Sequence, residues 1–240
     1  VRATLCPDKI DTAQWLEVME TAHNLGLRST ATIMFGHVDS APAWVTHWQR
    51  VIELQRRTGG FSEVVPLPFV SEGAPLYRRG ESRPGPTWRE ARLMHAVLRL
   101  TVGHVIPNIQ ASWVKLGRAG ALDMLSAGAN DLGGVLINES ITRAAGAAHG
   151  QMWPPEALSQ AILGAGRIPQ QRSTRYEPLQ TSLINLHPAL VRWVGETPAG
   201  RLATSKATRS WCAASKTGSL SSWRSLFSRP QTCHPAPLEK

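Results

Sequence analysis

The sequence predicts an α/β fold that forms the C-terminal half of a (β/α)8 TIM-type barrel and ends in an irregular tail. Helical patterns with apolar residues three or four apart alternate with strand-like runs along residues 1–178. Short connections between them are typical of parallel strands joined by helices. Four such strands make half of a barrel, whose complete form needs about 250 residues. The alternation begins in mid-pattern at Val1, without an initiator methionine, so we expect the first half of the barrel to be missing.

One helix and one strand are predicted near the start of the chain. Residues 11–25 predict a helix that Asp11 or Thr12 caps. Residues 27–35 predict a strand that runs directly into Gly36-His37-Val38-Asp39.

A second helix and strand follow. Residues 40–58 predict a helix with Pro42 in its first turn. Residues 61–69 are strand-like, although Pro66 and Pro68 are expected near a strand end rather than in its middle. The helix also carries two tryptophans one turn apart, which we expect to pack in the interior: Trp44 and Trp48.

The next segment is a loop, residues 71–86, rich in glycine, proline and arginine. Thr87 and Glu90 have the spacing of a capping box and predict a helix over residues 87–101. The basic side chains of the loop are expected in solvent: Arg78, Arg79 and Arg83.

Residues 105–134 predict a strand, a helix and a further strand. Both strands carry polar side chains among apolar ones, and a strand buried on both faces should be nearly all apolar. Such polar groups cost free energy unless they meet partners or a ligand. A loop or short helix over residues 138–150 and a helix over residues 154–164 complete the pattern.

Composition narrows the classes of protein. Hydrophobic residues make up 42% of the 240 residues, which excludes a wholly disordered chain. No apolar run is long enough for a transmembrane helix and no signal peptide opens the chain, so we expect a soluble, cytoplasmic protein without a membrane partner. The three cysteines are too far apart for a disulfide framework or a CxxC metal site: Cys6, Cys212 and Cys233.

Charge is uneven along the sequence. Residues 181–240 hold eight basic and two acidic side chains, whereas the whole chain has a net charge of +9. We assign residues 179–240 to a low-complexity basic tail, disordered or unrelated to the barrel. Basic tails bind nucleic acid or anionic membranes, but no aromatic-basic recognition motif accompanies this one, so we expect no specific nucleic-acid partner.

Several long motifs in order resemble one family, the radical S-adenosylmethionine enzymes that build deazaflavin and menaquinone-pathway intermediates. The resemblance is nearest to FO synthase, in its second subunit or the C-terminal half of the fused enzyme. It covers residues 1–177 and rests on these segments: LCPDKI (5–10), ATIMFGHVD (31–39), VPLPF (65–69), IPNIQASWVKLG (106–117) and GANDLGG (128–134).

The resemblance implies a cofactor pair and a reaction. In the family a 4Fe-4S cluster and S-adenosylmethionine start transfer of a 4-hydroxybenzyl group from tyrosine to 5-amino-6-(D-ribitylamino)uracil. The cofactor carries the hard step and the barrel supplies binding and orientation. The family's C-x3-C-x2-C motif is absent here, and cluster irons need thiolate ligands. We therefore expect this chain to hold no cluster and to be inactive unless a separate N-terminal half-barrel completes it.

The resemblance also places candidate ligand-binding residues, though none with a catalytic or metal-binding role. S-adenosylmethionine is expected at the end of strand 27–35 and the loop after it, at Thr32, Met34, Gly36 and Asp39. Substrates are expected at His37, Asn108, Gln110, Trp113, Asn130, Asp131 and Glu139. Glycine lets a ligand approach the backbone, and the aspartate carboxylate can accept ribose hydroxyls.

Structural alternatives stand beside these assignments. His37 is equally a packed residue at a strand end, and for Asn108, Gln110 and Trp113 the alternative to a substrate site is internal bracing of the barrel mouth. Asn130 and Asp131 also suit a self-bonded Asx turn, and Glu139 a helix start. For the whole chain the alternatives are a non-catalytic remnant with a basic tail and a relative from the menaquinone pathway.

Overall fold

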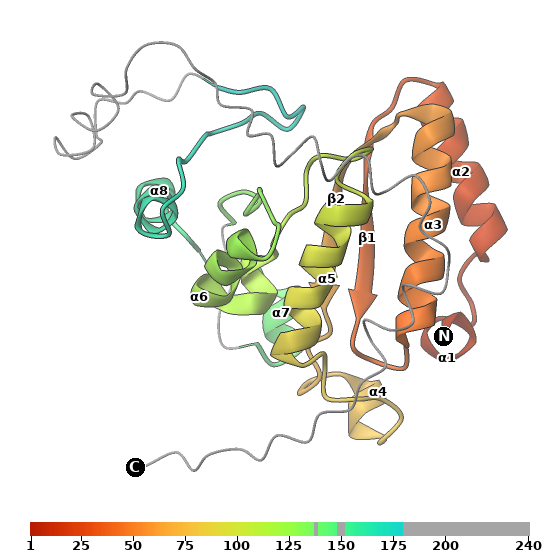
Figure 1. The fold of residues 1–240 in the computed structure, drawn as a ribbon. Coiled ribbons are helices and arrows are strands. Elements are labelled where there is room, and N and C mark those ends of the chain that lie inside the picture. The colour runs from red at the N-terminus through yellow and green to blue at the C-terminus, as the bar shows by residue number, and fades with distance from the viewer. Residues whose placement is uncertain (137–138, 148–151, 180–240) are drawn as a thin grey trace, which may run out of the picture. The chain divides into compact units, whose positions relative to one another are not determined.

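The computed structural model describes residues 1–136, 139–147 and 152–179. The chain divides into two units after Leu179, and the described residues belong to the first. Apart from Leu179, the predicted tail lies outside the described residues. The elements, labelled in Figure 1, are α1 (Arg2–Leu5), α2 (Thr12–Asn24), β1 (Ser29–Phe35), α3 (Ala41–Thr58), β2 (Phe61–Pro68), α4 (Pro75–Arg78), α5 (Trp88–Thr101), α6 (Trp113–Ser126), α7 (Ile141–Ala144) and α8 (Pro155–Gly164).

Local capping signals set the helix starts where the sequence predicted them. Asp11 caps α2: its Oδ1 accepts from the Gln14 N–H at 2.9 Å, and Gln14 returns a bond to the Asp11 N–H. Thr87 and Glu90 form the same box at the start of α5. The helix predicted at residues 40–58 is α3, which ends at Gly59 in a left-handed conformation with φ 64°.

Strands β1 and β2 pair in parallel and define two faces. Ala31 and Phe35 of β1 are buried, and the Phe35 ring meets Trp44 of α3 edge-on at 5.7 Å. Alternate residues point the other way because side chains of a strand alternate between faces. These are Thr30, Thr32 and Met34, all exposed, and the register sets them beside Glu63, Val65 and Leu67 of β2.

The two prolines lie in the last three residues of β2, near its end as expected, and Pro68 is its final residue. The backbone of Val64 points away from β1, because its N–H donates to Asn108 O and its C=O accepts from the Gln110 N–H. Pro66 and Pro68 share that direction by alternation. The stretch around Ile109 is the third of the sheet. Among the described residues, no bridge beyond Val64 joins it to β2. The missing proline N–H groups therefore interrupt no ladder bond.

The third and fourth predicted strands are reduced to single parallel bridges, Val64 to Ile109 and Gln110 to Asp131. Their order and direction agree with the prediction, but their length does not. The Ile109 N–H donates to the side-chain Oδ1 of Asn130 at 2.8 Å. A side-chain amide thus replaces a backbone ladder partner, which keeps the pairing short.

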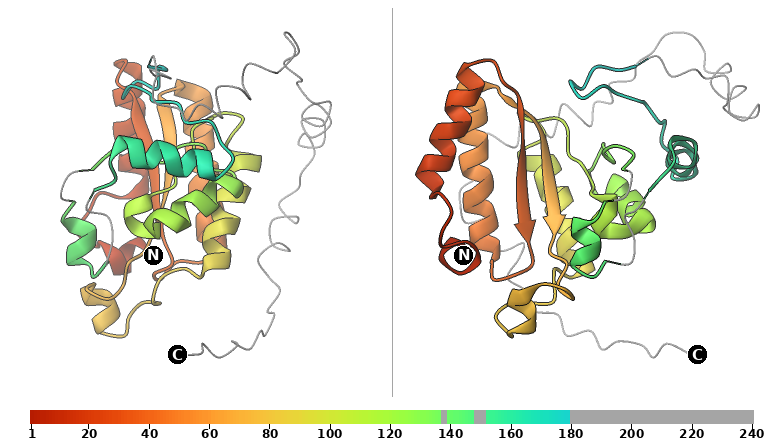
Figure 2. Two further views of the ribbon diagram at one scale, coloured as in Figure 1. Left: turned by 90° about the vertical axis from the view of Figure 1, so that its left-hand side faces the viewer. Right: turned by 180° about the vertical axis from the view of Figure 1, so that it is seen from behind.

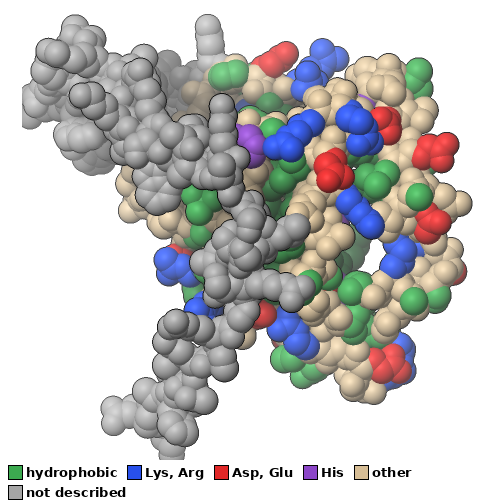
Figure 3. Space-filling model, turned by 45° about the vertical axis from the view of Figure 1, so that its right-hand side comes forward, with side chains coloured by type: hydrophobic (Ala, Val, Ile, Leu, Met, Phe, Trp, Pro, Cys, Tyr) green, Lys and Arg blue, Asp and Glu red, His purple; other side chains and the backbone are tan. Residues whose placement is uncertain are grey.

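Helices pack against β1 and β2 and against one another. Figures 1 and 2 show α3 beside β1 and α5 beside β2, with α2 against α3 and α6 against α5, in agreement with the contacts between these elements. Trp44 and Trp48 of α3 are buried as predicted. Figure 3 shows acidic and basic side chains interspersed on one face, and an exposed pair joins α3 to α2, with Arg57 Nη2 3.0 Å from Glu20 Oε2.

Two features of the helices were not predicted. Short helix α4 occurs in the loop expected at residues 71–86, and α1 lies in a stretch for which no element was predicted. Helix α6 is interrupted at Gly117, where φ 72° and ψ 169° leave the helical region.

Within the part of the chain that is described, no helix is both long and apolar enough to cross a membrane. The mixed helix and strand content agrees with the predicted α/β class.

Candidate functional site

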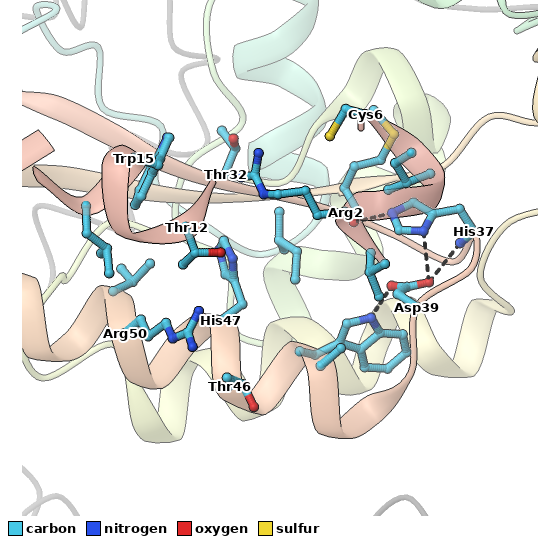
Figure 4. Close-up of a pocket in the computed structure, with 18 residues that line it drawn as sticks. Arg2, Cys6, Thr12, Trp15, Thr32, His37, Asp39, Thr46, His47 and Arg50 are labelled. Carbon is cyan, nitrogen blue, oxygen red and sulfur yellow. Dashed lines mark hydrogen bonds and ion pairs between the residues drawn. The ribbon is translucent and has the colours of Figure 1, made fainter. Parts of the chain in front are cut away.

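Four of the predicted ligand residues lie together around one cavity of about 540 Å³. Thr32 of β1 and His37 and Asp39 of the loop that follows line it (Figure 4), and Met34 of β1 lines it as well. Helices α1, α2 and α3 supply the remaining walls. The cavity borders the edge at which β1 and β2 end, called here the C-terminal edge.

Asp39 holds the loop at this edge. Its carboxylate accepts hydrogen bonds from the Gly36 N–H at 2.9 and 3.0 Å, from the His37 N–H at 2.8 Å and from the Trp44 indole N–H. Only 4% of the side chain is exposed. The oxygens expected to accept ribose hydroxyls thus already have three donors, and the contact with a ligand stays a prediction.

His37 is a neutral, packed side chain. Its Nδ1 accepts from the Val38 N–H at 2.7 Å, so the proton is on Nε2, which donates to Met34 O at 3.0 Å. Burial lowers the pKa of His37, with the nearby Asp39 opposing that shift. Its ring nitrogens both serve the backbone. A role in substrate orientation stays a prediction.

Gly36 lies where another part of the protein approaches closely, and its contact with a ligand stays a prediction. A Cβ on Gly36 would lie 2.3 Å from the Pro86 Cδ, and its φ of 95° disfavours any side chain. The nearby Arg83 corrects the expectation of a solvent position. The backbone N–H of Arg83 donates to His37 O at 3.1 Å. The Arg83 guanidinium forms an ion pair with Glu90 at 2.9 Å and lies 4.0 Å from Asp39.

Thr32 and Met34 remain available to a ligand because both residues are exposed and line the cavity. His47 of α3 also lines the cavity. Burial lowers the pKa of His47 to about 4, although a hydrogen bond with the Thr32 backbone raises it in part. His47 is therefore uncharged near neutral pH. Arg2 and Arg50 add positive charge to the walls (Figure 4).

A second group of predicted residues gathers around Glu63, the third residue of β2, toward the edge at which β1 and β2 begin, called here the N-terminal edge. Gln110 follows the bridge from Ile109 to Val64, so it lies level with Val65 and Thr32 rather than at the extreme of the sheet. Gln110 donates its Nε2 to both carboxylate oxygens of Glu63, at 3.3 and 3.2 Å. Asp131 accepts from the Nε of Arg172, whose Nη2 lies 3.6 Å from Glu63 Oε1. Tyr176 hydrogen-bonds Glu63 as well. These five residues are called the N-terminal cluster.

Glu63 is the most perturbed acid of this cluster. Only 2% of the residue is exposed. Burial raises the pKa of Glu63 to about 7, and the charge of Asp131 adds to the rise. Tyr176, Arg172 and Gln110 oppose it through hydrogen bonds and charge, but burial dominates.

The remaining predicted residues brace the fold. Asn108 donates its Nδ2 to Ser62 O at 2.8 Å. Asn130 accepts from Arg99 Nη2 at 2.8 Å, in addition to its bond from the Ile109 N–H. Bracing therefore describes the present partner of Asn108, whereas Asn130 bonds distant groups instead of forming the Asx turn. Asp131 makes that turn, because its Oδ1 accepts from the Gly133 N–H at 2.6 Å. The substrate contacts of both asparagines stay predictions.

Trp113 and Glu139 lie on separate elements. The buried Trp113 ring meets Trp153 at 5.7 Å and its indole N–H donates to Gly134 O at 3.2 Å. Glu139 accepts from the backbone N–H groups of Ile141 and Thr142, so it serves the start of α7. Substrate contacts for both residues stay predictions.

The donors present do not fit an iron–sulfur cluster. Within the described ranges, Cys6 is the one cysteine and no group of three or more His, Cys, Asp or Glu side chains is placed to hold a metal. An S-adenosylmethionine fits better, because Thr32 and Met34 open onto a cavity large enough for a small molecule.

Three participants were not singled out from the sequence. Glu63 had a signal, since it is the single charged residue of its strand. It lies two positions from Phe61 and from Val65, so it shares a face with these buried apolar residues. Arg172 and Tyr176 had none, because they reach Glu63 from more than 100 positions along the chain.

Comparison with known proteins gives a consistent result. The family model of the CofH/MqnC C-terminal region matches residues 58–184. A 5-amino-6-(D-ribitylamino)uracil--L-tyrosine 4-hydroxyphenyl transferase of Methanopyrus kandleri is 51% identical over 180 residues, 75% of this chain and 49% of that protein. The similarly named protein of Methanothermobacter thermautotrophicus is 45% identical over 180 residues, with the same two shares.

A longer class of relative also matches. An FO synthase of Streptomyces coelicolor is 49% identical over 179 residues, which are 75% of this chain and 21% of that protein. The chain thus spans about half the length of the transferases and about a fifth of the FO synthase.

Proposed function

Because the chain belongs to the family of the CofH/MqnC C-terminal region, we propose that it is the C-terminal half of a radical S-adenosylmethionine barrel in deazaflavin (FO) synthesis. The reaction would be transfer of a 4-hydroxybenzyl group from tyrosine to 5-amino-6-(D-ribitylamino)uracil. The observation that carries this proposal is the 51% identity to a transferase named for those two substrates.

The half-barrel would need a complementary half. In the described part of the chain, β1 has β2 on one side and no strand on the other. Thr30, Thr32 and Met34 leave its other face exposed, although strands inside a barrel are covered on both faces. An N-terminal half-barrel that adds strands beside β1 would cover this edge and enclose the face. Without it the chain would be inactive.

The residues at the C-terminal edge would divide the work of binding. Thr32 and Met34 would contact S-adenosylmethionine, and the Arg50 guanidinium suits a carboxylate. Asp39 and His37 would act indirectly, by holding the loop that shapes the cavity. When bound, the cofactor pair supplies the radical chemistry. The thiolates for the cluster would come from outside these 240 residues, on the complementary half.

Complementation tests this proposal. The 240-residue chain is produced alone and with the portion of the Methanopyrus kandleri transferase that lies outside the match. After anaerobic iron–sulfur reconstitution, 5′-deoxyadenosine and the coupled product are measured with tyrosine and the diaminouracil. The transferase portion alone is the control. We expect both products in the combined sample only.

The other outcomes separate the rivals. Product from the 240-residue chain alone would contradict the missing cluster. A folded complex without 5′-deoxyadenosine would favour the non-catalytic remnant. Formation of 5′-deoxyadenosine without coupling of tyrosine to the diaminouracil would favour the menaquinone-pathway relative, which the matching family also includes.

A further inference from the structure

The segment after α8 returns to the sheet, where Arg172 bonds Asp131 and approaches Glu63 near the start of β2. Residues 171–179 fold back on themselves: Arg172 and Pro178 form an antiparallel bridge, and the Leu179 N–H donates to Gln171 O at 2.9 Å. The Ser173 N–H donates to Glu177 O at 2.8 Å. This local closure gives the segment, called here the strap, a defined shape.

Two side chains of the strap enter the N-terminal cluster. Arg172 bonds Asp131, approaches Glu63 at 3.6 Å and lies 4.0 Å above the centroid of the Tyr176 ring. Tyr176 hydrogen-bonds Glu63. One cation thus joins two carboxylates that come from β2 and from the fourth stretch of the sheet, and the phenol satisfies the more buried carboxylate.

Backbone strain marks the same position. Tyr176 has φ 66°, and among the described residues no other non-glycine has a positive φ. A tyrosine in the left-handed region is unfavourable on its own and persists where surrounding contacts determine it. Here the contacts are those of its ring with Arg172 and of its hydroxyl with Glu63.

We propose that residues 171–179 are a strap that closes the N-terminal edge of the sheet, with Arg172 as the pin between Glu63 and Asp131. The strap leaves the C-terminal edge, with its cavity, as the open side. This inference concerns the architecture of the chain and is independent of the reaction that it supports.

Hydrogen exchange of the 240-residue chain, followed by mass spectrometry at pH 7, tests the strap. Arg172→Gln removes the pin, and Arg175→Gln is the matched control because Arg175 is exposed on the same strap. We expect Arg172→Gln to lower protection roughly tenfold in peptides from the strap and from the first half of β2. Protection of α3 should not change, and Arg175→Gln should match the wild type.

Equal effects of the two substitutions would overturn the proposal, as would exchange of the wild-type strap at the rate of an unfolded peptide. If Arg172→Gln lowers protection of α3 as well, the Tyr176→Phe variant distinguishes a local effect on the strap from a general loss of stability. It keeps the ring under Arg172 and removes only the hydroxyl, and we expect about a threefold loss confined to the strap and β2. No change in the strap of Tyr176→Phe would contradict the proposal.

Discussion

The two edges of the sheet satisfy their polar groups in different ways. At the C-terminal edge, Asp39 and His37 bond backbone groups within three positions of themselves. At the N-terminal edge, Glu63, Gln110, Asp131 and Arg172 come from four distant segments. A local network can form as soon as its loop forms, whereas the distant one requires the completed fold.

This difference bears on where a ligand can act. The C-terminal edge keeps Thr32 and Met34 exposed beside a cavity, so its polar network shapes a space without filling it. The N-terminal cluster uses Arg172 to fill the position between its carboxylates. The two groups therefore differ in what lies among their polar side chains: a cavity in the first and the Arg172 guanidinium in the second. The substitutions below test that division, from the largest expected effect to the smallest.

Removing the centre of the local network should have the largest effect. Asp39→Ala leaves the Gly36 N–H, the His37 N–H and the Trp44 indole N–H without their acceptor. We expect the free energy of unfolding to fall by about 4 kcal/mol in urea denaturation at pH 7. Asp8→Ala, at an exposed position, is the control and should change it little. A loss below about 1 kcal/mol would show that the loop does not depend on Asp39.

Titration of Glu63 should give the next largest effect. Its folded-state pKa of about 7 lies above the ordinary 4.5, so protonated Glu63 favours the folded state. This contribution is complete below pH 4.5 and is lost as pH rises through 7, by up to about 3 kcal/mol. Glu63→Gln should remove that pH dependence between pH 4.5 and 8, measured by urea denaturation. The exposed Glu17→Gln should retain it, and identical profiles for both would contradict the burial of a charge at Glu63.

A smaller loss is expected from Gly36→Ala. The added Cβ meets Pro86 at 2.3 Å and must adopt a φ of 95°. We expect a loss of about 2 kcal/mol in the free energy of unfolding. Gly26→Ala separates the two causes, because Gly26 has φ 82° with no atom within 4 Å of the new Cβ. That control should cost about 1 kcal/mol. Equal losses would mean that Pro86 moves aside freely.

The smallest stability effect should come from Thr32→Val, because the Thr32 side chain is exposed. The free energy of unfolding should change by less than about 0.5 kcal/mol. In the complemented enzyme the lost hydroxyl should raise the KM for S-adenosylmethionine roughly tenfold. Thr30→Val, on the same face of β1 but away from the cavity, is the control. Equal KM values for both variants would remove Thr32 from the cofactor site.

The helices and the first two strands were predictable because their signals are local. Capping boxes at Asp11 and Thr87 and the left-handed Gly59 act within a few positions of the element they bound. The third and fourth strands were overestimated, because the side chain of Asn130 replaces a ladder bond and no periodicity reports such a substitution. Pro66 and Pro68 were placed near the end of β2 correctly, because a proline is tolerated where the neighbouring strand has ended.

The sequence by itself determined the family, the alternation of helices and strands, and the loop at the end of β1, because each depends on motifs or contacts between near neighbours. The tertiary structure alone decided which polar residues share an edge. It separated Gln110 and Asp131 from His37 and Asp39, although the family motifs had predicted all four as ligand-binding residues. It also joined Arg172 and Tyr176 to Glu63, because a carboxylate buried among apolar side chains takes its partners from whichever segment folds over it, at any distance along the chain.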